Sequence, residues 1–86
     1  MFTVFTKLEG KWCKPNEKYA EADVQLSEIT RRCYLDNSCP IFYKRGTTNQ
    51  YFKCKGFYRI LSSTKGSTIY EKGIIRLNVV FRNHNN

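Results

Sequence analysis

The sequence alternates aromatic and basic side chains along one stretch near its middle. From residue 51 to residue 59, every odd-numbered position carries either an aromatic ring or a cation, and these residues are Tyr51, Lys53, Lys55, Phe57 and Arg59. Successive side chains of a β-strand point to opposite faces, so these side chains would share one face. Cations bind phosphates and exposed rings stack on nucleobases, which is the combination that sheet-based readers of single strands use. The pattern predicts a nucleic-acid-binding face.

A second alternating segment, residues 74–83, extends this prediction. One set of its side chains would face the core, and the set is Ile75, Leu77, Val79 and Phe81. The opposite set adds Arg76, Asn78 and Arg82 to the basic face if both strands belong to one sheet. A β-bulge at Gly56 would turn part of this face over. Two other interpretations of the face stay open, a solvated polar surface and a basic surface for a protein partner.

Four cysteines are the second chemical feature of this chain of 86 residues. An even number of cysteines in so short a chain is typical of disulfides formed in an oxidising compartment. Among the three connectivities, we expect Cys33–Cys39 to close a short loop and Cys13–Cys54 to tie the N-terminal segment to a central strand. Buried free thiols in a reducing compartment are the alternative. A zinc site is the weakest interpretation because the Cys33–Cys39 spacing is too wide for a zinc knuckle, so we expect no metal or other cofactor.

No catalytic arrangement stands out in the sequence. It contains no Gly-rich phosphate loop and no paired histidines, and its one histidine, His84, lies in a polar C-terminal segment. Glu71 is the only acid that could act beside the basic face, as a ribonuclease would require. We therefore predict a binding protein without enzymatic activity, with a ribonuclease-like activity as the enzymatic alternative.

The net charge of +8 lies entirely in the second half of the chain. Residues 1–43 hold six basic and six acidic residues, whereas residues 44–86 hold nine basic residues and a single acid, Glu71. Charge concentrated in this way creates a positive field over one part of a surface. An anionic partner is the expected consequence.

Apolar residues at helical spacing predict a helix over residues 17–33. The spacing alternates between three and four positions, and the residues are Tyr19, Ala22, Leu26, Ile29 and Cys33. Pro15 and Asn16 would supply the stop and the N-cap before it. A strand over residues 24–29 is the competing interpretation.

The other segments favour β-structure. Strands are predicted over residues 2–8, 41–45, 50–61, 68–71 and 74–83, with Glu71-Lys72-Gly73 as a hairpin loop between the last two. Trp12 is expected to anchor the core. The fold class is therefore α+β, with one helix packed on a curled antiparallel sheet of about five strands in the order β-α-β-β-β-β. Residues 1–83 would form a single domain, and residues 84–86 a frayed tail.

Two hypotheses for function follow. In the first, the chain is an intracellular domain, with Met1 as its native start, that binds single-stranded nucleic acid or another polyanion. In the second, a signal peptide has been removed, and a secreted, disulfide-stabilised effector, toxin or inhibitor binds a host protein. Neither hypothesis involves a transmembrane segment, because the longest apolar runs are three residues against the roughly 20 that a spanning helix needs.

Overall fold

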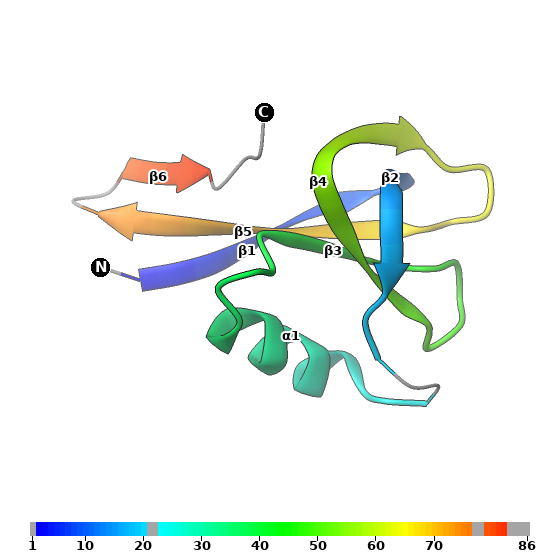
Figure 1. The fold of residues 1–86 in the computed structure, drawn as a ribbon, viewed down its shortest axis with the longest axis horizontal. Helices are drawn as coiled ribbons and strands as arrows, with labels where there is room; N and C mark the ends of the chain where they lie inside the picture. Colours follow the sequence, from blue (N-terminus) through cyan, green and yellow to red (C-terminus); the bar gives the residue numbers. More distant parts are fainter. Residues whose placement is uncertain (1, 21–22, 77–78, 83–86) are drawn as a thin grey trace.

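The computed structural model describes residues 2–20, 23–76 and 79–82, and the side chains of residues 5–20 and 23–73. Its elements, shown in Figure 1, are β1 (Phe2–Glu9), β2 (Lys11–Lys18), α1 (Leu26–Leu35), β3 (Ile41–Lys44), β4 (Tyr51–Ser62), β5 (Thr68–Arg76) and β6 (Val79–Arg82). One short helix with antiparallel strands agrees with the α+β class. The order of elements differs from the prediction, because two strands rather than one precede the helix.

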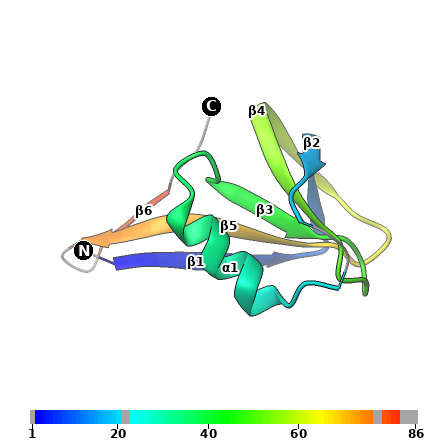
Figure 2. The same ribbon diagram turned by 60° about the horizontal axis from the view of Figure 1, so that its bottom comes forward.

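All the strands belong to one antiparallel sheet with the order β1-β5-β3-β4-β2, and β6 pairs with β5. Strand β5 is central. One of its edges pairs with β1, and its other edge pairs with β3 along residues 68–71 and with β6 along residues 73–76. The sheet is single, as the sequence predicts, but it is not curled. Strands β1, β3 and β5 run side by side, whereas β4 and β2 rise steeply from them (Figures 1 and 2).

Two hydrophobic clusters fill the space on the two sides of β3. The first joins β2 and β4 to β3 and β5, and its buried members are Cys13, Ile41, Tyr43, Cys54, Tyr58 and Ile69. The second lies under α1, and its buried members are Ala20, Ile29, Cys33, Cys39, Phe42 and Tyr51. Successive residues of β3 point alternately into the two clusters, so both faces of this strand are buried.

One disulfide lies in each cluster. Cys13–Cys54 joins β2 to β4 across a sequence separation of 41, and Cys33–Cys39 joins α1 to the segment before β3 across a separation of 6. All four cysteines are therefore paired, in the connectivity that we expected.

The helix begins later than the sequence pattern predicts. Residues 11–18 form strand β2, in which Asn16 and Glu17 pair with Cys54 and Lys53 of β4. The Tyr19 N–H then donates to the Tyr51 carbonyl at 2.9 Å, so the ladder continues past the start of the predicted helix. Pairing with β4 thus overrides the helical spacing of the apolar residues in this segment. The competing strand over residues 24–29 is also wrong, because the helix begins at Leu26.

The predicted hairpin loop Glu71-Lys72-Gly73 is wrong as well. These residues are buried inside β5, where Glu71 pairs with both Thr6 of β1 and Ile41 of β3. A residue that is paired with strands on both sides cannot belong to a hairpin loop. The chain instead passes from β5 to β6 through residues 77–78, which lie outside the described residues, as does the predicted tail of residues 84–86.

Two side chains organise the end of α1. The buried Lys72 ammonium donates to the carbonyls of Cys33 at 2.7 Å and Asp36 at 3.0 Å, and burial lowers the pKa of Lys72. The Asp36 carboxylate accepts from the Ser38 hydroxyl at 2.7 Å and from the Tyr19 hydroxyl at 2.7 Å. These bonds lower the pKa of Asp36 to about 2, with the Ser38 hydroxyl as the largest cause. The helix end is thus tied to β5 and to the segment after β2.

Candidate functional site

Tyr51 does not lie on the predicted binding face. It is fully buried in the cluster under α1, where its ring meets the Phe42 ring edge-on at a centroid distance of 6.3 Å. Burial is also the main reason why the pKa of its hydroxyl is raised. The prediction fails because Tyr51, at the start of β4, lies on the face of the sheet that α1 covers.

Lys53 and Lys55 are held by a glutamate that the sequence prediction placed in a helix. The Lys53 ammonium lies 3.4 Å from one carboxylate oxygen of Glu17, and the Lys55 ammonium lies 3.9 Å from the other. Lys53 also lies over the Tyr19 ring at 5.6 Å and donates to the Ser38 hydroxyl at 3.2 Å. Lys55 remains exposed, but Lys53 is mostly committed to contacts within the molecule.

A bulge in β4 presents Phe57 to solvent. The β2–β4 register jumps from Lys14 opposite Arg59 to Asn16 opposite Cys54, so several residues of β4 face a single position of β2. Gly56, with a φ of +49°, supplies the backbone conformation that such a bulge requires. Phe57 is 84% exposed, whereas Tyr58 beside it is buried. Arg59 is exposed as well, but strict alternation does not hold along this part of β4, because Ile60 is 38% exposed.

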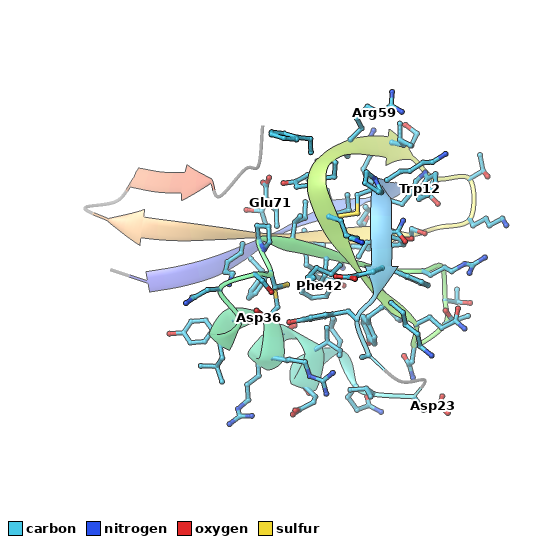
Figure 3. All side chains as sticks on the ribbon, viewed as in Figure 1. Trp12, Asp23, Asp36, Phe42, Arg59 and Glu71 are labelled. Atoms are coloured by element: carbon cyan, nitrogen blue, oxygen red, sulfur yellow. A yellow bond between two sulfur atoms is a disulfide. The ribbon has the colours of Figure 1, made fainter. Side chains whose placement is uncertain are left out.

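Lys14 and Arg59 form a like-charged pair across the β2–β4 ribbon. They are register partners, so their side chains leave the same face of the ribbon, and both are exposed. Within the described part of the chain, neither has an acidic side chain at salt-bridge distance. Figure 3 shows Arg59 projecting away from the body of the molecule. Sequence reasoning missed Lys14 because it predicted no strand there.

We use the name basic ribbon surface for four exposed residues of the β2–β4 ribbon, which are Lys14, Lys55, Phe57 and Arg59. The other predicted site residues cannot be added to it from the structure. Arg76 and Arg82 end strands β5 and β6, but their side chains, like Asn78 as a whole, lie outside what the structure describes. Their part in a binding site stays a prediction.

A hollow of about 470 Å³ lies between β2, the end of β3 and the loop of residues 62–67. Three rings form its floor. Tyr43 and Phe52 are stacked at 5.2 Å, and Trp12 meets Tyr43 edge-on at 6.4 Å. The exposed side chains of Arg45 and Lys65 stand at its rim. We call this feature the aromatic hollow.

The two loops that carry Arg45 and Lys65 are packed against each other. A Cβ atom on Gly46 would lie 2.9 Å from the Lys65 carbonyl oxygen, so only glycine fits there without movement. The Gly46 N–H donates to the buried Ser67 hydroxyl at 3.4 Å, and the Trp12 indole N–H donates to the Ser62 carbonyl at 3.2 Å. The two Gly46 contacts hold the backbones of the loops together, and the third ties Trp12 to the end of β4.

The described residues hold no group of three or more His, Cys, Asp or Glu side chains that could bind a metal ion. Among them, no helix has the length and apolar character needed to cross a membrane. Comparison of the chain with protein-family models, curated proteins and solved structures finds no match.

Proposed function

We propose that this protein is a non-catalytic binding domain for a polyanion, with single-stranded nucleic acid as the ligand class that fits best. The observation that carries the proposal is Phe57, which is 84% exposed on the same ribbon as Lys14 and Arg59. An aromatic ring on an open basic surface offers a stacking platform beside cations that can hold a strand's backbone.

The energetics of the basic ribbon surface support this function. Lys14 and Arg59 repel each other across the ribbon, which costs the folded protein up to about 1 kcal/mol. A phosphate placed between them turns this repulsion into attraction. Stacking of one base on Phe57 adds about 1–3 kcal/mol. A bound anionic strand would therefore relieve the repulsion between Lys14 and Arg59 and would cover the exposed Phe57 ring.

The salt dependence of binding tests the electrostatic half of the proposal. Affinity for a labelled single-stranded oligonucleotide, measured by fluorescence anisotropy, should fall with salt with a log–log slope of roughly −2 if three cations contact phosphates. Arg59→Gln should make this slope shallower by about 0.7. Arg31→Gln, which removes the same charge from an exposed position on α1, is the matched control and should leave the slope unchanged. A slope near zero, or equal effects of the two variants, would contradict the proposal.

A second candidate is a secreted, disulfide-stabilised effector, toxin or inhibitor that binds a host protein. It is favoured by the two disulfides, which cross-link both clusters of so small a domain. Such staples are typical of small domains in oxidising compartments. A thiol count on unfolded, unreduced protein from its native source should then give zero free thiols. Four free thiols would exclude this candidate.

A further inference from the structure

We propose that the aromatic hollow binds a small molecule that carries a planar ring and an anionic group. The hollow uses residues other than those of the basic ribbon surface, and the inference does not depend on strand binding. It rests on the presence, in one hollow, of aromatic side chains that line its floor and of two cations, Arg45 and Lys65, at its rim.

The floor suits a planar ring. Phe52 and Trp12 are only partly buried, so each leaves ring surface open to the hollow. Tyr43 beneath them is only 5% exposed, and it stacks on Phe52 and contacts Trp12 edge-on. These contacts hold the floor rigid before a ligand arrives, which lowers the entropic cost of binding. The volume of about 470 Å³ lies within the range of small-molecule pockets.

The rim suits an anion. Arg45 and Lys65 stand over the hollow, and none of the described side chains that line it is acidic. Neither cation is neutralised by a carboxylate within the described residues. The tight approach of Gly46 to the Lys65 carbonyl holds the two loops together. A phosphate or carboxylate attached to a ring in the hollow would meet these cations, and the planar Arg45 guanidinium can bind it through two parallel hydrogen bonds.

The fluorescence of Trp12 gives a direct readout, because Trp12 is the only tryptophan in the chain. The folded protein is titrated with three ligands that carry both a ring and an anionic group: adenosine monophosphate, phenyl phosphate and benzoate. Adenosine, which has a ring without the anion, and inorganic phosphate, which has the anion without a ring, are the controls. Ring-bearing anions should change the fluorescence saturably. Adenosine monophosphate should bind about tenfold more tightly than adenosine, the size of effect expected for a charge-assisted contact. The responses to phenyl phosphate and benzoate distinguish phosphate ligands from carboxylate ligands.

Variants of the rim locate the anion. Arg45→Gln and Lys65→Gln should each weaken binding of adenosine monophosphate about threefold to tenfold and leave adenosine unaffected. Lys55→Gln, which removes an exposed charge outside the hollow, should change neither. The inference is overturned if no ring-bearing anion produces a saturable change, or if the preference over adenosine survives in the Arg45→Gln/Lys65→Gln double variant. Phe57→Ala should leave these titrations unchanged, so failure here is distinguishable from failure of strand binding.

Discussion

The two disulfides should contribute unequally to stability, although both are buried. Removing Cys13–Cys54 frees a segment with a sequence separation of 41, whereas removing Cys33–Cys39 frees one with a separation of 6. In the loop-closure model the first bond is worth roughly 4 kcal/mol and the second roughly 2 kcal/mol. All four side chains are at most 2% exposed, so the cavities left by alanine are similar in the two cases. The difference of about 2 kcal/mol therefore reports the loop lengths.

Urea unfolding of two double variants measures this difference. Cys13→Ala/Cys54→Ala and Cys33→Ala/Cys39→Ala each keep one disulfide, so each is the control for the other, and linear extrapolation gives both free energies of unfolding. The first variant should be the less stable by about 2 kcal/mol. A first variant that is largely unfolded without denaturant agrees with the reasoning if the second remains folded. Equal losses, or a larger loss on removal of Cys33–Cys39, would refute it.

Two further predictions concern the loops. Asp36→Asn should lower the free energy of unfolding by about 1 kcal/mol at neutral pH, once screening by solvent is allowed for. Because the folded pKa of about 2 lies below the ordinary value, this loss should shrink as the pH falls below about 4 and disappear once the pH is below 2. An equal loss at pH 4 and pH 2 in urea titrations would contradict it. Gly46→Ala should cost about 1 kcal/mol more than Gly56→Ala, since both glycines have positive φ but only the first would meet a backbone oxygen, at 2.9 Å. Thermal unfolding compares the two variants, and equal midpoints would show that the loops do not depend on this contact.

Local patterns in the sequence were sufficient for several elements. Alternation located β1, β3 and β4 to within one residue at each end. The pairing of the four cysteines was also anticipated, because a bond from the N-terminal segment to the long strand and a short loop closure are compatible with this topology. These features depend on residues close in sequence, or on the limited number of ways to pair four thiols.

Strand β2 could not be predicted because its sequence carries no β signal. Its residues include Pro15 and four charged side chains, and its apolar neighbours have helical spacing. It forms because it lies at the edge of the sheet, where Pro15 needs no second partner, and because Cys13 is bonded to Cys54. Both causes depend on distant parts of the chain.

The same omission explains the errors in the candidate site. Without β2, Glu17 could not be placed against Lys53 and Lys55, and Lys14 could not be placed beside Arg59. The burial of Tyr51 depends on the position of α1, which local alternation does not encode. The aromatic hollow was unforeseeable for a related reason: its rings come from β2, β3 and β4 and meet only through the register of the sheet.

The most direct test of the proposed function is the contribution of Phe57 to strand binding. Phe57→Ala removes the exposed ring, and Tyr34→Ala removes a ring that is 51% exposed on α1 as a matched control. Anisotropy titrations with one labelled single-stranded oligonucleotide compare both variants with the parent protein. Loss of one stacking contact predicts binding about tenfold weaker for Phe57→Ala and unchanged for Tyr34→Ala. Equal affinities of all three proteins, or no binding by the parent at low salt, would contradict it.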